Sequence, residues 1–552
     1  MAAALRPVRR GVNGAAGLAY AGLGAPILGG LAVTGAAAFG YLPALGQTHA
    51  SLAPWRRLFA EPGLAASLAL TVSVGVLATA LSLTLAFALL ARGRAALPTP
   101  LLAAPHSAVA VGLAFLLAPS GWIVRLFSPW ATGFHAPPDW ATVGDPWGLS
   151  LTLGLIVKET PFLIAIGAAA LGDLPAPAQL QAARALGHRP ARAWGLVIAP
   201  QLYARVRWPV YAVLAYGLSV VDMALVLAPS HPAPLSLIAL HWLTSPDLAD
   251  LAPGEAAALL QAGLVVATLA LWRLAERAAA FALVRLAATG RRSGAADALA
   301  PVLAGLARAT LALGLAALAA LALWAVAWRW PFPRAWPESL SLQLIAAQAP
   351  LLAAPLANTL ALAGVSAGAS LALAIAWLEG EDRIGRRAGS ALIFAPLLAP
   401  QIAFLFGVET LAFRLRFDGG FPAVAWAHGL FVFPYVWLTL SGPWRGLDPR
   451  YARAASALGR GKLATLLLVK LPMLAAPLAL AFAVGVAVSV AQYLPTLFVG
   501  GGRVATLTTE ALALASGGDR RLQGVVSLAQ TLVPLVVYAA AAGVAARWGR
   551  KA

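Results

Sequence analysis

The sequence consists mainly of long apolar runs that are separated by shorter segments rich in charged residues. A helix needs about 20 apolar residues to cross the hydrocarbon core of a bilayer, and each run reaches about that length. Backbone polar groups in hydrocarbon must be paired internally, so the runs are expected to be helices. They lie near residues 16–41, 64–91, 97–118, 148–171, 205–228, 254–275, 301–327, 351–378, 389–413, 422–442, 474–499 and 522–546. The pattern predicts an all-α polytopic membrane protein with about 12 transmembrane helices.

The composition excludes other broad classes of protein. Of the 552 residues, 61% are hydrophobic and 11% are charged, whereas soluble domains are roughly 45–50% apolar and roughly 25% charged. Disordered chains need low hydrophobicity and high charge, which is the opposite balance. The chain has no cysteine, which excludes disulfides and cysteine-ligated metals. The apolar runs also leave no room for a soluble catalytic domain.

The basic residues indicate how the helices are oriented. The formal net charge is +19, and 27 of the 39 Lys and Arg residues fall in alternate loops on one side of the predicted spans. By the positive-inside rule that side is cytoplasmic, and both termini lie on it. The basic excess is therefore a topology signal, and we expect no nucleic-acid binding.

The chain contains an internal duplication. Residues 181–200 resemble residues 453–472, which lie 272 positions later. The matched residues are Ala182, Ala183, Gly187 and Pro200 in the first copy, and Ala454, Ala455, Gly459 and Pro472 in the second. Six spans in each half give both halves the same orientation in the membrane. We expect a first domain at 1–277, a cytoplasmic linker at 278–300 and a second domain at 301–552.

Each copy has the signals of a short helix in a cytoplasmic loop between the fourth and fifth spans of its half. In the second copy, Asp448 is a good N-cap residue and Pro449 suits the first helical position. Gly459 follows the helix, where a left-handed backbone costs other residues about 1–2 kcal/mol. The first copy repeats this with Pro177 and Gly187 but lacks a good N-cap. A short helix held at both ends is suited to docking into a groove on another protein.

The spacing of both copies resembles the EAA loop of permease subunits of binding-protein-dependent ABC importers. In that family the loop holds a coupling helix that docks on the ATP-hydrolysing subunit. Two copies in one chain look like the permeases of iron(III) and thiamine importers, and most resemble an uncharacterised inner-membrane permease group close to them. The resemblance implies two tandem six-helix permease domains. It marks as ATPase-coupling residues Gln181, Ala182, Ala183, Gly187, Pro200, Arg453, Ala454, Ala455, Gly459 and Pro472.

The sequence departs from that loop at its first position. The glutamate that opens the motif is replaced by Gln181 in the first copy and by Arg453 in the second. These departures concern the contact with the partner at two positions, and they leave the Ala-Ala and Gly geometry intact.

The resemblance also implies the partners. Gly461 and Lys462 are followed by Leu463, where a phosphate loop needs Ser or Thr, so the chain has no nucleotide site of its own. ATP hydrolysis, with ATP and Mg²⁺ bound to the partner, is expected on two copies of a separate ABC ATPase. A periplasmic or extracytoplasmic substrate-binding protein is expected on the opposite side. The chain itself is expected to be a transport subunit among the lipids of the inner membrane, without enzyme activity, cofactor or metal.

A second function class stays open. Residues Asp382 to Arg387 resemble the loop signature of major-facilitator secondary transporters and lie between the second and third spans of the second half. The glycine expected four residues before Asp382 is Leu378, however, and the first-half loop at Arg92 has no acidic residue. A major-facilitator-like transporter is therefore the alternative. An integral-membrane enzyme would need acids, bases or metal ligands clustered at one depth, and the sequence shows no such cluster.

Ionisable residues within spans are candidates for a translocation path, because a charge near the bilayer centre costs at least about 2.5–3.5 kcal/mol. Asp222 is the clearest case, and its counterpart in the second half is Gln492. Two roles stay open for Asp222: lining the path, or forming a hydrogen bond between two helices. Lys158 and Glu159 point about 100° apart as helical neighbours, so at least one should face the bundle interior. His428 is expected to be packed rather than metal-bound, since no second ligand stands at metal-site spacing.

Overall fold

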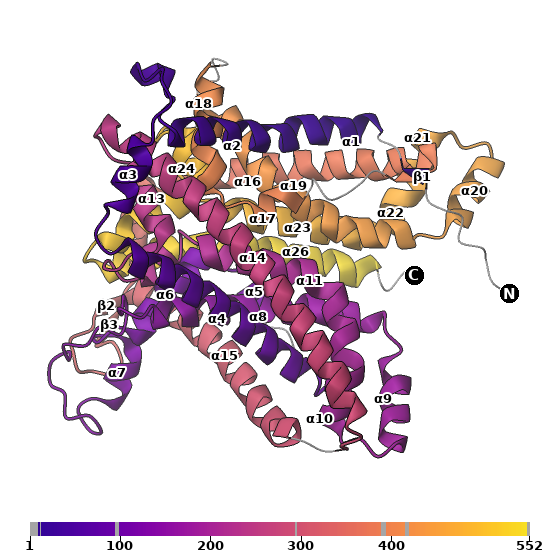
Figure 1. Ribbon diagram of the computed structural model, residues 1–552, viewed down its shortest axis with the longest axis horizontal. Coiled ribbons are helices and arrows are strands. Elements are labelled where there is room, and N and C mark those ends of the chain that lie inside the picture. Colours follow the sequence, from indigo (N-terminus) through magenta and orange to yellow (C-terminus); the bar gives the residue numbers. More distant parts are fainter. Residues whose placement is uncertain are drawn as a thin grey trace.

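The computed structural model describes residues 9–10, 13–93, 99–292, 295–387, 394–414 and 419–548. Within these residues, nine helices are long and apolar enough to cross a membrane. The pair Lys462–Met473 and Ala475–Val490, bent by 78°, adds a tenth span if it is counted as one. The chain is therefore an all-α polytopic bundle, as the sequence predicts (Figure 1).

The first half contains the following helices and turns. They are α1 (Gly14–Ala19), η1 (Tyr20–Gly24), α2 (Ala25–Ala38), η2 (Pro43–Leu45), α3 (Ala53–Phe59), α4 (Leu64–Leu90), α5 (Thr99–Ala103), α6 (His106–Leu117), α7 (Trp122–Phe127), α8 (Leu149–Gly172), α9 (Ala176–Ala185), α10 (Pro190–Ala193), η3 (Trp194–Ile198), α11 (Ala199–Ser219), α12 (Ala224–Leu227), α13 (Leu235–Leu243), η4 (Leu248–Asp250) and α14 (Leu251–Ala288).

The second half repeats this order with shorter outer connections. Its elements are α15 (Ala295–Val326), α16 (Gln343–Ile384), α17 (Ala395–Leu398), α18 (Ile402–Arg414), α19 (Phe421–Gly446), α20 (Pro449–Ala457), α21 (Lys462–Thr465), η6 (Leu466–Lys470), α22 (Leu471–Met473), α23 (Ala475–Val490), α24 (Leu494–Gly500), α25 (Leu507–Ala513), η7 (Leu514–Ser516) and α26 (Arg520–Trp548). Two small sheets join β1 (Arg9–Arg10) to β4 (Arg386–Arg387), and β2 (Ala327–Arg329) to β3 (Ser339–Leu340).

The count of about 12 spans differs from the nine or ten found among the described residues. The run expected at 205–228 is divided, because α11 ends at Ser219 and Val220 is extended before α12 begins. In the run expected at 389–413, residues 389–393 lie outside the described part, and α18 is only 13 residues long. The linker expected at 278–300 overlaps the ends of two long helices, because α14 continues to Ala288 and α15 begins at Ala295.

The first helix of each half packs against the other half. Helix α2 packs on α18, and α15 packs on α6, α4 and α8, as Figure 1 also shows. Small residues lie at both crossings: a Cβ on Gly112 would stand 2.3 Å from the carbonyl oxygen of Ala317, and one on Gly30 would stand 2.4 Å from that of Phe404. Helices in lipid associate through such close packing, because no hydrophobic force separates a helix from the lipid tails. The halves are therefore interleaved and do not merely lie side by side.

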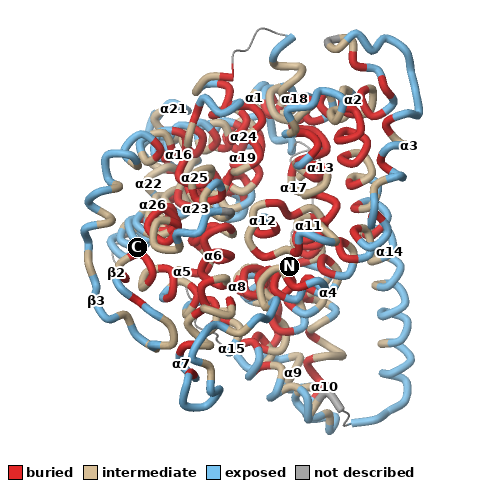
Figure 2. The backbone as a smooth tube through the Cα atoms, turned by 90° about the vertical axis from the view of Figure 1, so that its left-hand side faces the viewer, coloured by how far each residue is buried: buried red, intermediate tan, exposed pale blue. Residues whose placement is uncertain are grey.

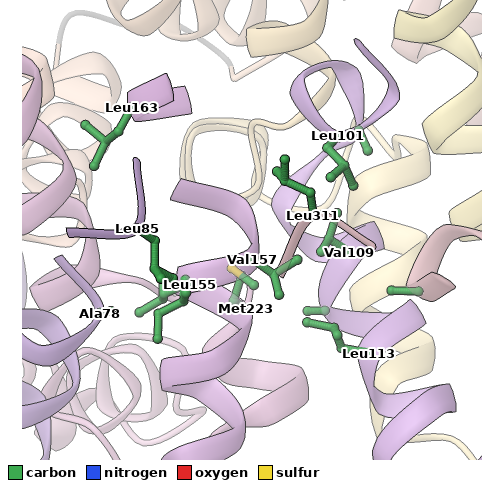
Figure 3. Close-up of a cluster of buried hydrophobic side chains, with 14 of the residues drawn as sticks. Ala78, Leu85, Leu101, Val109, Leu113, Leu155, Val157, Leu163, Met223 and Leu311 are labelled. Atoms are coloured by element: carbon green, nitrogen blue, oxygen red, sulfur yellow. The ribbon is translucent and has the colours of Figure 1, made fainter. Parts of the chain in front are cut away.

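A large apolar core lies in the first half and includes a helix of the second. Figure 3 shows Leu101, Leu155, Val157 and Met223 around Leu311, which comes from α15. Outward-facing apolar side chains are also numerous, as along the exposed part of α14 in Figure 2. This distribution fits a bundle that faces lipid, where an apolar surface needs no protein cover.

Matching contacts recur in the two halves. The backbone N–H of Leu235 donates to Thr71 Oγ1 at 3.0 Å, and that of Leu507 donates to Thr359 Oγ1 at 2.9 Å. Both threonine hydroxyls also bond to a carbonyl one turn earlier in their own helix. Leu235 and Leu507 begin α13 and α25, so the same side-chain contact fixes the start of a short helix in each half.

Candidate functional site

The two similar segments found in the sequence lie at one end of the bundle. Helices α9 and α10 of the first segment (residues 181–200) and α20 and α21 of the second segment (residues 453–472) lie at the end where α1 starts and α26 finishes (Figure 1). The short helices α3, α7 and α13 lie at the opposite end. The first segment connects α8 to α11, and the second connects α19 to α23.

Each segment begins inside the predicted short helix. Helix α20 starts at Pro449, and the carboxylate of Asp448 accepts a hydrogen bond from the backbone N–H of Arg450 at 2.8 Å. Helix α9 starts after Pro175, which supplies no side-chain cap. The difference in N-caps that the sequence predicts is therefore confirmed.

Glycine ends both helices in the same way. Gly187 has a φ of 85° and Gly459 a φ of 77°, which is the left-handed region. The next residue closes the turn: the N–H of His188 donates to the carbonyl of Ala183 at 3.2 Å, and that of Arg460 to the carbonyl of Ala455 at 3.0 Å. The left-handed glycine is as the sequence predicts, and these bonds complete a Schellman motif.

In each alanine pair, one residue is exposed and the other is buried. Ala183 and Ala455 are each 6% exposed, so a larger side chain would meet the bundle. Their neighbours on the outer face are exposed, namely Gln181, Ala182, Arg453 and Ala454. Leu186 and Leu458, at the tips, are 69% and 83% exposed. Helix α20 therefore buries one alanine, and helix α9 buries Ala183 together with Ala176, while the tips of both helices stay exposed.

A π-helical turn follows in both segments, at Trp194–Ile198 and at Leu466–Lys470. Pro200 and Pro472 stand two residues after these turns. Proline has no backbone N–H, so the regular hydrogen-bond ladder cannot continue through it. The two turns are 272 positions apart, like the rest of the repeat, and π-turns of this kind are frequent at functional sites.

Three of the four candidate path residues have defined partners inside the first half. The Lys158 ammonium donates to the carbonyls of Leu101 at 2.7 Å and Ala104 at 2.6 Å. Lys158 thus satisfies the carbonyl end of α5, which is a structural role. Glu159 is also buried, and its Oε1 lies 3.2 Å from His106 Nε2. Both neighbours therefore face the interior.

Asp222 belongs to a chain of polar side chains that begins at Glu159. Tyr216 donates its hydroxyl to Asp222 Oδ1 at 2.8 Å, and the rings of Tyr216 and His106 are 4.7 Å apart. Tyr435 and Tyr493 of the second half lie within electrostatic range of Glu159 and Asp222, respectively. The chain of contacts therefore lies where the two halves meet.

Gln492 is buried and donates to the carbonyl of Val488 at 3.2 Å in its own helix. Within the described residues, no hydrogen bond joins it to the Asp222 chain. His428 is packed between two hydroxyls, with Nδ1 at 2.8 Å from Ser489 and Nε2 at 2.9 Å from Thr496. Within the described ranges, no group of three or more His, Asp or Glu side chains could hold a metal ion.

Comparison with known proteins decides the family. No family model matches the chain, and no solved structure matches it. The chain is 32% identical over 519 residues to the inner membrane ABC transporter permease protein YnjC of Escherichia coli strain K12, covering 92% of each chain. It belongs to the ABC transporter permeases. This membership does not favour the major-facilitator alternative, and a permease is consistent with a chain that is not itself an enzyme.

The sequence did not identify every polar residue at the centre of this permease. His106 and Tyr216 connect Glu159 to Asp222, but neither was a candidate. A histidine directly after Pro105 within an apolar run was the available signal. Tyr216 gave no such signal in the sequence, because a single tyrosine in an apolar helix does not indicate a function until its partner is known.

Proposed function

We propose that this permease forms the substrate path of an ATP-driven importer and receives the work of ATP hydrolysis through residues 181–200 and 453–472. The observation that carries the proposal is the pair of matching segments at one end of the bundle, each with a short helix, a left-handed glycine and an exposed tip. A structural loop would not need the same geometry twice. Two identical binding sites on a partner would require the same geometry in both segments.

The rigidity of each segment supports a mechanical role. The Schellman motif and the seated alanine fix the direction of the short helix relative to the long helices that flank it. A force on the tip at Leu186 or Leu458 would therefore move the bundle instead of bending a loop. The exposed leucines supply the apolar surface that a groove on the partner would bury.

The partner proposed for each segment is one copy of an ABC ATPase, which holds ATP and Mg²⁺. Because this chain contains both segments, one chain would bind two ATPase copies. The layout is that of the iron(III) and thiamine permeases, with both domains in one polypeptide. Both termini and both segments would then lie in the cytoplasm, on the side that the basic residues indicate.

The substrate would pass between the halves along the chain from Glu159 to Asp222. Placing a carboxylate inside a membrane bundle costs free energy, so such groups are usually found beside a polar pathway or a partner. On the opposite side of the membrane, an extracytoplasmic binding protein would deliver the substrate, which sets the direction as import.

The test compares two glycines of the second segment. Gly459→Val forces a β-branched residue into a left-handed backbone. Gly461→Val is the control, because a φ of −67° and a ψ of 164° is an extended backbone that valine adopts without strain. Gly459→Val should insert normally but lose roughly ten-fold in uptake, since a strain of about 1–2 kcal/mol corresponds to that factor. The measurements are co-purification of the ATPase, uptake into vesicles and ATP turnover. Full uptake by Gly459→Val and Gly187→Val would overturn the coupling proposal.

A further inference from the structure

Helix α16 ends in an unusual group of acids. Glu379, Glu381 and Asp382 all lie in its last six residues, before Gly385 ends the helix. The carboxyl end of a helix carries partial negative charge, so carboxylates there are unfavourable unless they have partners elsewhere. Local helix preferences do not explain why three acids stand at this position, so the reason lies in their tertiary contacts.

Lys470 supplies the central contact. It is the last residue of the π-turn in the second segment, and it is 9% exposed. Its ammonium lies 2.6 Å from Glu379 Oε2 and 2.6 Å from Asp382 Oδ2. Trp444 of α19 closes the group, because its Nε1 donates to Asp382 Oδ2 at 3.1 Å and its ring lies 5.4 Å from the ammonium. We call Lys470, Glu379 and Asp382 the Lys470 latch.

The remaining charges around the latch are paired as well. Arg383 donates to Glu379 at 2.9 Å, and Arg445 of α19 donates to Glu381 at 2.9 Å. The side chains of α16, α19 and the π-turn are therefore joined by two neighbouring groups of ion pairs and hydrogen bonds. A partly buried network of this kind holds its members in one arrangement, because separating any pair leaves a charge without its partner.

The described part of the first half contains no such latch. The residue 272 positions before Lys470 is Ile198, which is fully buried, and the last four residues of α4 contain no acid. The first segment has a different attachment: the N–H of Arg189 donates to the carbonyl of Arg292 at 3.0 Å, and Arg192 donates to the carbonyl of Leu286 at 3.0 Å. The lysine and its acids are thus present together in one half and absent together in the other.

We propose that Lys470 is a positioning residue that transmits the motion of α20 to α16 and α19, so that the two segments drive the bundle through different connections. This inference rests on the proposed function, because it assumes that α20 is moved by a partner. In the second segment the force passes through the Lys470 latch. In the first segment it passes to the end of α14 and the residues that follow.

The experiment compares Lys470→Met with Arg92→Met, which removes an exposed positive charge at the end of α4, in the full chain reconstituted with its ATPase and binding protein. The readout is the ratio of ATP turnover with the binding protein to turnover without it. Lys470→Met should lower this ratio about five-fold or more, the range of typical coupling between sites, while the ATPase still co-purifies. Arg92→Met should keep the ratio, and Lys470→Arg should restore it in part. An unchanged ratio in Lys470→Met, or an equal loss in Arg92→Met, would overturn the proposal.

Two further measurements keep the result interpretable. If Lys470→Met does not fold, Lys470→Met with Glu379→Gln also removes the buried carboxylate charge that faced the lysine, and the same ratio is measured on that variant. The chain has no native cysteine, so spin labels at Ser456→Cys and Ile384→Cys report the distance from α20 to the end of α16. A narrow distance distribution that broadens in Lys470→Met supports the latch, and one that is unchanged contradicts it. A wild-type complex without any stimulation would contradict the proposed function, while the label distances still report on the latch.

Discussion

A Cβ atom on Gly407 would lie 2.1 Å from the carbonyl oxygen of Gly30, so helices α18 and α2 touch backbone to backbone. The contact joins α2, the first membrane helix of the first half, to α18 of the second half. Its counterpart joins Gly112 of α6 to Ala317 of α15. The two crossings hold the interleaved halves together, and each requires a residue without a side chain on at least one helix.

This contact leads to a prediction about stability. Gly407→Ala should destabilise the purified protein by about 1–3 kcal/mol, the usual cost of forcing extra atoms into a packed site. Gly429→Ala in α19 is the control, because a Cβ there meets nothing within 4 Å. The measurement is thermal unfolding in detergent. A melting temperature of Gly407→Ala equal to that of Gly429→Ala would refute the close crossing.

The matched threonines lead to a second prediction. Thr359→Val should leave the buried N–H of Leu507 without its acceptor, at a cost of about 1–3 kcal/mol. Thr439→Val is the control, since Thr439 bonds only to the carbonyl of Tyr435 in its own helix. Hydrogen exchange of the Leu507 amide should rise in the first variant alone. Thr71→Val should have the same effect on Leu235.

A third prediction concerns pH. Burial alone would raise the pKa of the Asp145 carboxyl, but hydrogen bonds from Ser150, Leu149 and Trp147 outweigh it and hold this pKa below its usual value. A lowered pKa in the folded state means that the stabilisation is complete above about pH 4, the pKa of an unfolded aspartate, and is lost as the pH falls through the folded value.

The variant Asp145→Ala removes the acceptor for the first turn of α8, where the N–H groups of Leu149 and Ser150 each lie 2.8 Å from the carboxylate. We expect a loss of about 1 kcal/mol at pH 7, as for other residues that cap a helix. Melting temperatures of wild type and variant should converge as the pH is lowered below about 4. A constant difference across that range would contradict the assignment.

The fourth prediction separates the two roles that the sequence left open for Asp222. Tyr216→Phe removes the hydrogen bond to Asp222 but keeps the carboxylate, whereas Asp222→Asn removes the charge and can keep a bond. If the charge acts on the substrate, Asp222→Asn should lower uptake about ten-fold and Tyr216→Phe should be near wild type. Vesicle uptake at matched amounts of assembled complex measures both. The reverse order would assign Asp222 to helix packing.

The short helices α9 and α20 were the part of the candidate site most open to prediction. Asp448, Gly187 and Gly459 act on backbone groups within about five residues of themselves, and the bonds form as expected. Lys158 was less open to prediction. Its charge within an apolar run was visible, but its partners are carbonyls more than 50 residues away in α5.

The division of the run expected at 205–228 has a related cause. Hydropathy adds up over a run whether or not the backbone stays helical, and the break at Val220 interrupts a run that is apolar on both sides. The break is stabilised from outside the run, because Ser236 donates its hydroxyl to the Val220 carbonyl at 2.7 Å. Pattern analysis along the chain does not detect a partner of that kind.

The sequence by itself determined that this chain is a helical membrane bundle, that it contains a repeated segment, and how each short helix begins and ends. All of these depend on residues that are close in the chain or on the transfer of whole runs from water to lipid. Only the tertiary structure decided that the halves interleave at Gly30 and Gly407, that Glu159 and Asp222 share one polar chain, and that Lys470 holds the end of α16. Those features depend on which helix faces become neighbours, and packing between distant residues selects them.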